Sequence, residues 1–344
     1  MKLKTIISLS LVLIVLVASY YGYSIYTKIF SANTTIENQE VYVHIPTDAH
    51  FKKVEEIMSP YLSDLKAFEL TADKTGYIQN IRPGRFAIKK GMNSYEIIAA
   101  LRQNIPVKLT FNNQETIEDF AGRIAQQIEP DSLTLLQSLT DPSFLEKNEF
   151  TPETILSMFI PNTYEFYWNT TATQFGNKLA KEYRRFWNED RKAKAAALGL
   201  TPQQVSTLAS IVHKETVKTD ERPRVAGVYL NRLKNGMPLQ ADPTVIYGIK
   251  KNDNDFRQVI KRVMQHHLLV DSPYNTYKIQ GLPPGPIAMP DISAIDAVLN
   301  YEKHDYLYFC ASVDRFGYHE FAKNLAQHNI NSAKYHRWVR KQGY

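Results

Sequence analysis

The sequence predicts an α+β protein with three parts: a single N-terminal transmembrane helix, a small α/β module, and a larger, mostly helical domain with a few short strands. Three observations carry this prediction. An uncharged, mostly apolar run of about 22 residues lies close to the N-terminus. Strand-like alternation and helical spacing follow in a short central stretch. From residue 106 onward, apolar residues recur at helical spacing, interrupted by loops rich in proline and glycine.

Length and composition are those of a folded protein with two domains or one large one. Hydrophobic residues make up 44% of the 344 residues and aromatic residues 12%, enough for a sizeable core. The 41 Lys and Arg residues exceed the 35 Asp and Glu residues, for a net charge of +6. This excess suits an anionic surface or polymer, but the basic residues are scattered and the common nucleic-acid-binding motifs are missing. We therefore expect no nucleic-acid partner.

The single cysteine, Cys310, lies in the apolar run Tyr306-Leu-Tyr-Phe-Cys-Ala311. A lone cysteine forms no disulfide within the chain, and no charged neighbour in the sequence activates this thiol. We therefore expect Cys310 to be a small core residue.

The apolar run at residues 5–26 is long enough to span a bilayer. Two lysines lie in the preceding segment, residues 1–4, and positive charge before a span places that end in the cytoplasm. The sequence therefore predicts a single-pass protein of the inner (cytoplasmic) membrane, with the rest of the chain outside the cytoplasm.

A cleaved signal peptide is the alternative interpretation of this run. Val17-Ala-Ser19 offers a weak small-residue cleavage site. The apolar run continues past that site, and its tyrosines are typical of the aromatic belt at a membrane interface; they are Tyr20, Tyr21 and Tyr26. This continuation favours an uncleaved anchor.

Residues 27–40 are mostly polar and predict a linker, and residues 41–105 predict the small module. Alternating apolar residues from Val41 indicate a strand, and an amphipathic stretch covers residues 51–65. Residues 84–101 predict a strand, a glycine turn, an Asn/Ser cap and a helix. This pattern resembles a LysM module, a small fold that binds cell-wall glycans. A strand–helix unit that serves only packing would give the same pattern.

Residues 106–344 predict the larger, helical domain. Amphipathic segments cover residues 117–128 and 133–145. The segment 159–168 breaks this pattern because it crowds aromatic side chains around a proline.

The most informative segment is the helix predicted after Thr201. Thr201 and Gln204 form a capping-box pattern, with Pro202 at the first helical position. Apolar residues then recur at helical spacing, at Val205, Leu208, Ala209 and Val212. At roughly 100° per residue, Glu215 falls within about 20° of Leu208, at the edge of this apolar face. Burial there disfavours the charged carboxylate, and a raised pKa suits a general acid near neutral pH.

Glu215 is therefore the candidate catalytic residue. His213 falls about 160° away on the same helical wheel, so we do not expect it to exchange protons with Glu215. An ordinary glutamate at the border of an amphipathic helix would show the same spacing, because perturbed carboxylates mark functional sites only statistically.

Loops rich in proline and glycine follow, at residues 237–248, 271–277 and 281–287. Proline and glycine fix irregular backbone, and such loops on a helical scaffold often carry binding residues. Their polar side chains suit the hydroxyl and N-acetyl groups of sugars, and the predicted substrate-binding residues are Gln240, Asp242, Thr244, Asn275 and Tyr277. The alternative is that these segments are structural turns.

A second helix is predicted between Glu221 and Gly236. Glu221 and Asp242 are further carboxylates that would shape the pocket or the pKa of Glu215, unless they only cap turns. The histidines lack a metal-binding spacing such as His-Glu-x-x-His, and we expect surface or structural roles for His266, His267, His304, His319, His328 and His336. We predict no metal site and no cofactor.

Six motifs follow one another in the second half of the chain. They are Ala209-Ser-Ile-Val-His-Lys-Glu-Thr216, Glu221-Arg-Pro-Arg-Val-Ala-Gly-Val-Tyr-Leu-Asn-Arg-Leu233, Gly236-Met-Pro-Leu-Gln-Ala-Asp-Pro-Thr244, Ser272-Pro-Tyr-Asn-Thr-Tyr277, Gly281-Leu-Pro-Pro-Gly-Pro286 and Tyr306-Leu-Tyr-Phe309. In this order they resemble the YceG-like (MltG) family of endolytic murein transglycosylases, and residues 159–166 are similar to that family's upstream signature. Many members have a glutamate where this chain has His213; the resemblance assigns the catalytic acid to Glu215.

The resemblance implies a membrane-anchored endolytic lytic transglycosylase. Such an enzyme cleaves the β-1,4 bond between N-acetylmuramic acid and N-acetylglucosamine in nascent peptidoglycan without water, leaves 1,6-anhydro ends and ends strand elongation. Glu215 would act first as general acid and then as base. Glycan strands are the implied substrate, and peptidoglycan synthases are the implied partners.

Two other functions stay open at this point. A muramidase that uses water needs two carboxylates, and Asp242 would be the second one beside Glu215. A non-catalytic scaffold would bind the cell wall through the LysM-like module, with Glu215 incidental.

Overall fold

The protein is described by a computed structural model that covers residues 2–342. Met1 of the predicted cytoplasmic segment 1–4 lies outside the described residues, as do the side chains of Lys2, Lys4 and Thr5. Within the described chain the fold is mostly helical, with three short two-stranded sheets, β1–β2, β3–β4 and β5–β6. The α+β class predicted from the sequence is therefore confirmed at this level.

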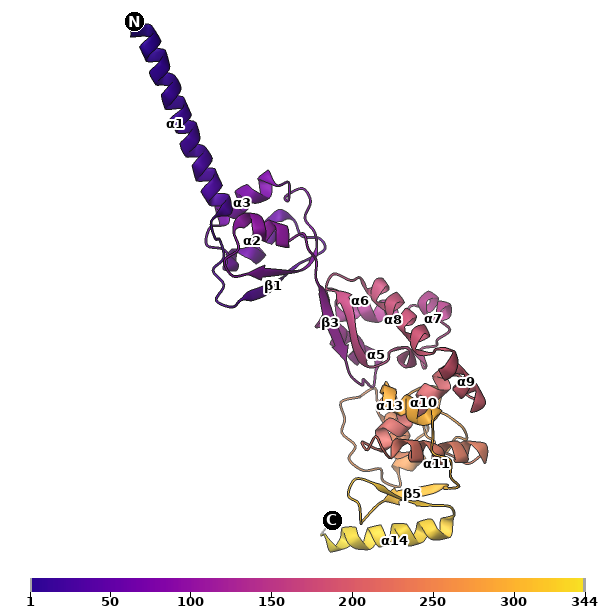
Figure 1. The fold of residues 1–344 in the computed structure, drawn as a ribbon. Helices are drawn as coiled ribbons and strands as arrows, with labels where there is room; N and C mark the ends of the chain where they lie inside the picture. The colour runs from indigo at the N-terminus through magenta and orange to yellow at the C-terminus, as the bar shows by residue number, and fades with distance from the viewer. Residues whose placement is uncertain (1, 343–344) are drawn as a thin grey trace. The chain divides into compact units, whose positions relative to one another are not determined.

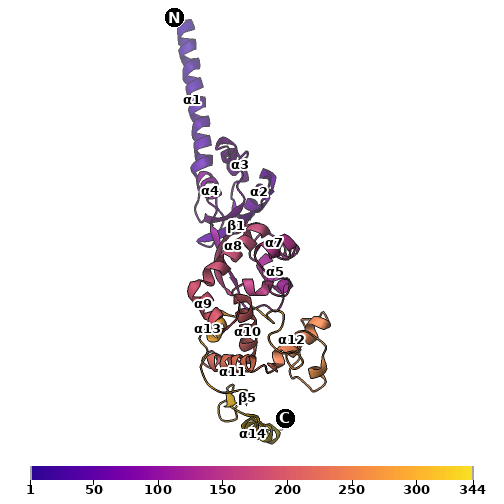
Figure 2. The ribbon, with the colours of Figure 1, turned by 90° about the vertical axis from the view of Figure 1, so that its right-hand side faces the viewer.

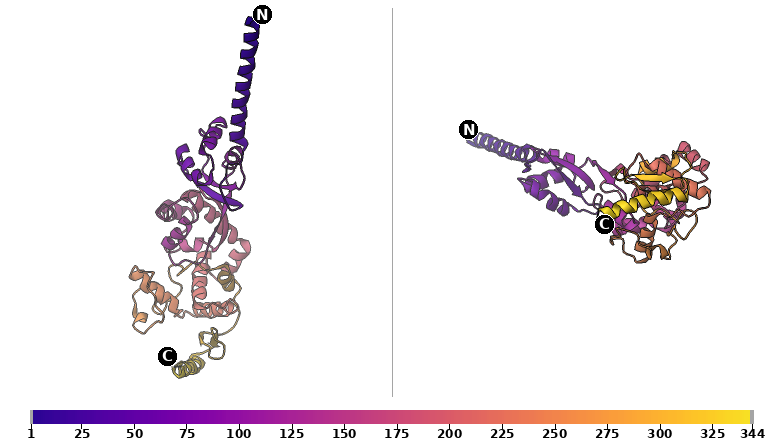
Figure 3. Two further views of the ribbon diagram at one scale, coloured as in Figure 1. Left: turned by 90° about the vertical axis from the view of Figure 1, so that its left-hand side faces the viewer. Right: turned by 90° about the horizontal axis from the view of Figure 1, so that it is seen from below.

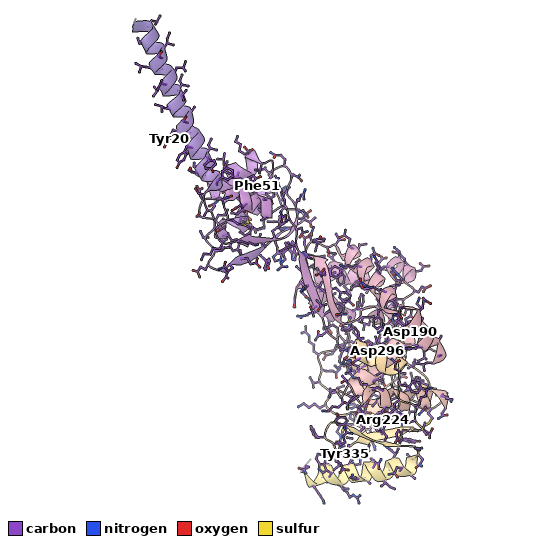
Figure 4. The ribbon with its side chains drawn as sticks, viewed as in Figure 1. Tyr20, Phe51, Asp190, Arg224, Asp296 and Tyr335 are labelled. Carbon is purple, nitrogen blue, oxygen red and sulfur yellow. The ribbon has the colours of Figure 1, made fainter. Side chains whose placement is uncertain are left out.

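The N-terminal helix α1 (Lys2–Phe30) contains an apolar stretch, Ile6–Phe30, that is long enough to cross a membrane. None of its most apolar window is buried in the protein, and Tyr20, labelled in Figure 4, is 71% exposed. The helix runs beyond the predicted end of the span at residue 26. Both a membrane anchor and a signal sequence have these properties.

The contacts divide the chain into two compact units. The first contains residues up to 109 together with 127–129 and 165–171, and the second contains 110–126, 130–164 and the chain from 172 onward. The boundary falls within β3 (Pro106–Phe111) and its partner β4 (Asn162–Tyr167).

The first unit is a small α/β structure attached to α1 (Figure 1). After α1 its elements are β1 (Glu40–Ile45), α2 (Phe51–Met58), a 3₁₀ turn (Ser59–Tyr61), α3 (Leu65–Lys74), β2 (Gly84–Lys89) and α4 (Ser94–Ala100). β1 and β2 pair antiparallel, and the apolar side chains of the pair Val43 and Phe86 are both buried. As predicted, Asn93 caps α4, and Glu96 completes a capping box. The amphipathic stretch 51–65 is not one helix, because Pro60 has no amide hydrogen to continue the ladder.

The polar segment after α1 is held against this unit. Asn33 is only 2% exposed. Its side-chain amide donates to the backbone oxygen of Asp64 at 2.8 Å and to Ser94 Oγ at 2.9 Å, and its side-chain oxygen accepts from Ser63 Oγ at 2.8 Å. A buried amide that satisfies both ends in this way fixes the start of the linker predicted at residues 27–40.

The second unit is mainly helical. Its remaining elements are α5 (Ile117–Ala125), α6 (Ser132–Leu139), α7 (Pro142–Lys147), a 3₁₀ turn (Ile155–Met158), α8 (Ala172–Phe186), α9 (Glu189–Ala197), α10 (Pro202–Glu215), α11 (Arg222–Lys234), α12 (Asp242–Asn252), a 3₁₀ turn (His267–Leu269), α13 (Ile292–Leu299), β5 (Tyr308–Ala311), β6 (His319–Ala322) and α14 (Leu325–Lys341). The amphipathic segment at 133–145 is divided between α6 and α7, because Asp141 caps a new helix at Pro142.

The core that positions the candidate site lies around α10. This helix packs against α11, α12 and α13 (Figure 2), and all eight of its residues from Val205 to Val212 are buried. Tyr229 of α11 and Val298 of α13 belong to the same apolar cluster. The interior is therefore built by the helix that ends at Glu215.

The C-terminal part is less buried than the sequence indicated. β5 and β6 form a hairpin beside α14 (Figure 3), and every residue of β5, including Cys310, is half-buried. The expectation that Cys310 is a core residue is therefore wrong: a two-stranded hairpin with a helix beside it leaves its residues partly open to solvent.

Candidate active site

The position of Glu215 is determined by α10. Thr201 and Gln204 form the predicted capping box, so the helix begins at Pro202. Glu215 is the last helical residue, and the chain becomes extended at Thr216. A carboxylate at this end faces the partial negative charge of the helix dipole. Glu215 is half-buried, and burial raises its pKa.

Tyr229 of α11 is the hydrogen-bond partner of Glu215. Its hydroxyl donates to Glu215 Oε2 at 3.1 Å. Tyr229 is 1% exposed, and burial raises its pKa well above the ordinary value, so that it stays a neutral donor. This hydrogen bond lowers the pKa of Glu215, although burial outweighs it.

A second tyrosine–carboxylate pair lies close by. Tyr277, from the loop after α12, donates to Asp242 Oδ1 at 2.6 Å, and Asp242 is the first residue of α12. The negative charge of Asp242 is one of the influences that raise the pKa of Glu215, after burial. Glu215, Asp242 and Tyr277, predicted from separate motifs, are thus brought together.

Arg232 of α11 supports the loop that carries Gln240. The Arg232 side chain is buried and donates to the backbone oxygens of Leu307 at 2.6 Å and Leu239 at 2.7 Å. It also reaches Gln240 Oε1 at 3.4 Å. Gln240 is exposed and has a positive φ of 50°, which an L residue adopts only when its surroundings hold it there. The guanidinium therefore fixes an irregular loop next to Glu215.

The buried Glu221 pairs with the half-buried His319. Glu221 is 5% exposed and accepts from the backbone N of His319 at 2.7 Å, and its Oε2 lies 2.8 Å from His319 Nδ1. Thr216 Oγ1 donates to the same carboxylate at 3.2 Å. Burial alone would raise the pKa of Glu221, but the hydrogen bonds from His319 outweigh burial and lower it. Glu221 lies at the N-cap position of α11, yet its side chain makes no capping hydrogen bond.

Two glutamates six positions apart thus have opposite environments. The pKa of Glu215 is raised and that of Glu221 is lowered. Such a separation is how active sites assign the acid role to one carboxyl and a charged, structural role to another. His319, which lowers the pKa of Glu215 electrostatically, links the two.

The other two predicted binding residues lie below the surface. Thr244 is buried, and its hydroxyl is within 2.8 Å of Thr276 Oγ1. Asn275 is also buried, and its amide donates to the backbone oxygens of Leu268 and Val270 at 3.0 and 2.9 Å. Thr244 holds α12, which begins at Asp242, against the loop that carries Tyr277, and Asn275 holds that loop in place.

His213 is separated from Glu215, as the helical wheel predicted. Its Nδ1 lies 3.3 Å from Asp291 Oδ2, and Arg222 donates to the same carboxylate at 2.8 Å. His213 therefore belongs to a contact between α10 and α13, not to the cluster around Glu215.

Sequence reasoning missed Tyr229, Arg232 and His319 as parts of this site. Tyr229 lies within the helix predicted between Glu221 and Gly236 without an assigned role, and His319 was expected to have a surface or structural role. Their links to Glu215 and Glu221 cross 14 and 98 positions of the chain. Local spacing carries no signal for such pairs.

The fold and the site together describe a helical domain built around α10, with a half-buried glutamate at the end of that helix and proline-rich loops beside it. The model of the YceG-like family matches residues 43–334, so this chain belongs to that family.

Named relatives agree with this placement. The endolytic murein transglycosylase of Bacillus subtilis (strain 168) is 29% identical over 338 residues, covering 92% of this chain and 90% of that protein. The endolytic murein transglycosylase of Streptococcus pneumoniae (strain ATCC BAA-255 / R6) is 26% identical and matches 85% of this chain and 60% of that protein. The crystal structure of a YceG-like protein from Listeria monocytogenes is 27% identical, covers 85% of this chain and 98% of its own, and has a TM-score of 0.58.

The raised pKa of Glu215 predicts a pH-dependent gain in stability for Glu215→Gln. A carboxyl whose pKa is higher in the folded than in the unfolded state stabilises the fold at low pH, and this stabilisation is lost as pH rises through the folded pKa. The variant should therefore melt at a higher temperature than the wild type at pH 8, with the difference closing below the ordinary glutamate value. Thermal melts from pH 4 to 8 measure this, with Glu146→Gln on α7 as the matched control. A difference that is constant across this range would contradict the burial of Glu215.

Proposed function

We propose that this chain is an endolytic lytic transglycosylase that cleaves the β-1,4 bond between N-acetylmuramic acid and N-acetylglucosamine in nascent peptidoglycan. The observation that carries the proposal is Glu215, a carboxyl with a raised pKa that holds a hydrogen bond from Tyr229 at the end of α10. A glycosidic oxygen needs a proton as its bond breaks, and a carboxyl that stays protonated near neutral pH supplies it. The names of the relatives support the same substrate and reaction.

The reaction balances with one carboxyl. Glu215 gives its proton to the bridging oxygen, and the bond from that oxygen to C1 of the muramic sugar breaks. The resulting carboxylate takes a proton from the C6 hydroxyl of the same sugar, and that oxygen bonds to C1. The product is a 1,6-anhydro end, Glu215 is protonated again, and no water is consumed. An attack within one sugar gains from proximity.

Tyr229 assists the charged form of Glu215. When Glu215 has given up its proton, the Tyr229 hydroxyl donates to the carboxylate, and a hydrogen bond to a charged acceptor is stronger than one to a neutral acceptor. The raised pKa of Tyr229 keeps its proton in place. Gln240, Asp242 and Tyr277 are the predicted residues left to contact sugar groups, and Thr244 and Asn275 position them.

The water-using muramidase is the second candidate. Asp242, whose charge acts on Glu215, would be its second carboxylate. Asp242 accepts a short hydrogen bond from Tyr277 and sits at the start of α12. The two reactions differ in their products, because a muramidase leaves reducing ends.

For the rest of the chain we propose the organisation inferred from the sequence. Residues 5–26 are a transmembrane anchor, 27–40 a linker, 41–105 a LysM-like module that binds glycan, and 106–344 the catalytic domain. The apolar, unburied α1 supports an anchor in the inner membrane, with the remainder outside the cytoplasm. Peptidoglycan synthases are the proposed partners, since an anchored enzyme meets strands as they emerge.

Glu215→Gln should lower the rate of anhydro-end formation by about a hundredfold to ten-thousandfold, the usual contribution of a general acid–base. The full-length protein in detergent is incubated with isolated glycan strands, and the ends are identified by mass spectrometry. Glu146→Gln serves as the control, and circular dichroism establishes that both variants are folded. Wild-type activity in Glu215→Gln would remove Glu215 from the mechanism, and reducing ends would favour the muramidase. A wild-type protein that binds strands without cutting them would support the scaffold.

Tyr229→Phe should lower kcat by roughly tenfold to a hundredfold, the value of a lost hydrogen bond to a charged group. The Tyr229 hydrogen bond lowers the pKa of Glu215, so its loss raises that pKa further. Because the protonated acid begins the reaction, the alkaline limb of the pH–rate profile should move to higher pH. Tyr164→Phe, which loses a tyrosine hydrogen bond to the backbone of Ile160, is the control. An unmoved limb would contradict direct contact between Tyr229 and the acid.

An uncleaved anchor predicts that the whole chain fractionates with the inner membrane and is released by detergent but not by high salt. Immunoblotting of fractionated cells, with N-terminal sequencing of the product, measures this. Recovery of a shortened chain in the soluble extracytoplasmic fraction would identify α1 as a signal peptide instead.

A further inference from the structure

A cavity lies in the same helical unit, and Glu215 is not among the residues that line it. It is a cleft of about 680 Å³ between the start of α5, the segment before the 3₁₀ turn at Ile155–Met158, and the C-terminal end of α12. The mechanism above uses none of its lining residues.

The cleft contains side chains of both charges, and its cations form no ion pairs within the described residues. The cations Lys251 and Arg257 line it together with four acidic residues, Glu118, Asp119, Glu153 and Asp255. Within residues 2–342, neither cation has an ion-pair partner, whereas the neighbouring Lys250 is paired with Glu115 at 2.9 Å. The Lys251 ammonium lies 5.0 Å from the ring centre of Tyr274 instead. Free cations and anions in one concave site suit a ligand that carries both kinds of charge.

The floor of the cleft is aromatic. The ring centres of Tyr247 and Tyr274 lie 4.6 Å apart, and those of Phe256 and Tyr247 lie 5.4 Å apart. Tyr274 is buried, and its hydroxyl has no hydrogen-bond partner among the described residues.

Two elements, α12 and the loop after it, contribute residues both to the cleft and to the site of Glu215. α12 begins at Asp242, beside Glu215, and carries Tyr247 and Lys251 toward the cleft. The loop after it brings Tyr277 to Asp242 and, three residues earlier, Tyr274 to Tyr247. A smaller cavity of about 170 Å³, lined by Lys214, Pro243 and Tyr247, lies between them along the helix.

The distance fits a particular part of the proposed substrate. Nine helical steps from Asp242 to Lys251 span about 14 Å. An extended chain of four residues spans about 13 Å. In peptidoglycan the muramic carboxyl is amidated by the peptide stem, so the sugars carry no charge. The stem carries carboxylates and, on its diamino acid, an amino group.

We propose that this cleft binds the peptide stem attached to a muramic sugar at the Glu215 site. Lys251 and Arg257 receive its carboxylates, Glu118 and Asp119 its amino group, and the aromatic floor its aliphatic parts. This proposal rests on the function proposed above, because it takes peptidoglycan as the substrate. It implies that strands with stems are cut faster than strands without them.

Binding is measured first, without catalysis. Full-length Glu215→Gln protein in detergent is titrated calorimetrically with the tetrapeptide L-alanyl-γ-D-glutamyl-L-lysyl-D-alanine and with its diaminopimelate counterpart. At least one should bind, and adding Lys251→Gln and Arg257→Gln should weaken binding by about tenfold or more. Lys181→Gln, an exposed cation on α8, is the matched control. Absence of binding by both peptides, or equal binding by the Lys251→Gln/Arg257→Gln protein, would overturn the proposal.

Cleavage is then compared on two substrates, glycan strands with stems and strands stripped of stems by an amidase. With Glu215 intact, Lys251→Gln/Arg257→Gln should form anhydro ends about tenfold more slowly than the wild type on strands with stems. On stripped strands the two proteins should have equal rates, even if both rates are low. If the wild type cuts stemmed strands and the double variant cuts them equally fast, the proposed role of the cleft is wrong, whereas the proposed enzymatic function stands. A wild type that cuts neither substrate defeats the proposed function, and the peptide titration still decides the cleft.

Discussion

The organisation of the catalytic unit depends on one unfavourable placement, a carboxyl half-buried at the negative end of a helix. Burial and the helix end both oppose ionisation of Glu215, and the nearby charge of Asp242 acts in the same direction. A fold tolerates such a group only if the surrounding structure is held by other contacts. Here the buried face of α10, from Val205 to Val212, supplies that rigidity.

The surroundings of Glu215 shift its pKa in both directions. Burial raises the pKa of Glu215, whereas the nearby His319 and the hydrogen bond from Tyr229 lower it. Glu221 fixes His319 through both its ring nitrogen and its backbone amide. A glutamate with a lowered pKa thus positions a histidine near a glutamate with a raised pKa.

Local features of this fold could be predicted from the sequence because they depend on neighbouring residues. The caps at Thr201 and Asn93 follow from side chains three positions from their partners. The position of Glu215 at the edge of an apolar face follows from helical periodicity. The glycine and proline motifs likewise marked fixed loops: a Cβ at Gly285 would lie 1.9 Å from the backbone oxygen of Glu153.

What the sequence could not give are pairings between distant segments. Periodicity places Tyr229 on the inner face of α11, but only packing decides that its hydroxyl meets Glu215. The half-burial of Cys310 depends on how little covers the hairpin of β5 and β6, and an apolar run does not encode that. Thr244 and Asn275 were expected to contact sugar because their loops are polar. In the fold, Thr244 is hydrogen-bonded to the Thr276 side chain and Asn275 to the backbone oxygen of Val270.

The two buried residues Thr244 and Asn275 connect the site of Glu215 to the cleft. Thr244 ties α12 to Thr276, and Asn275 ties the same loop to the backbone at Leu268 and Val270. α12 and the loop are therefore bonded to each other between the pair Asp242–Tyr277 and the pair Tyr247–Tyr274. In the proposed reaction the muramic sugar must be held in place against Glu215, because a misplacement of about 1 Å can cost a hundredfold in rate. A rigid element that grips a substituent of that sugar at its far end would restrict its rotation at the near end.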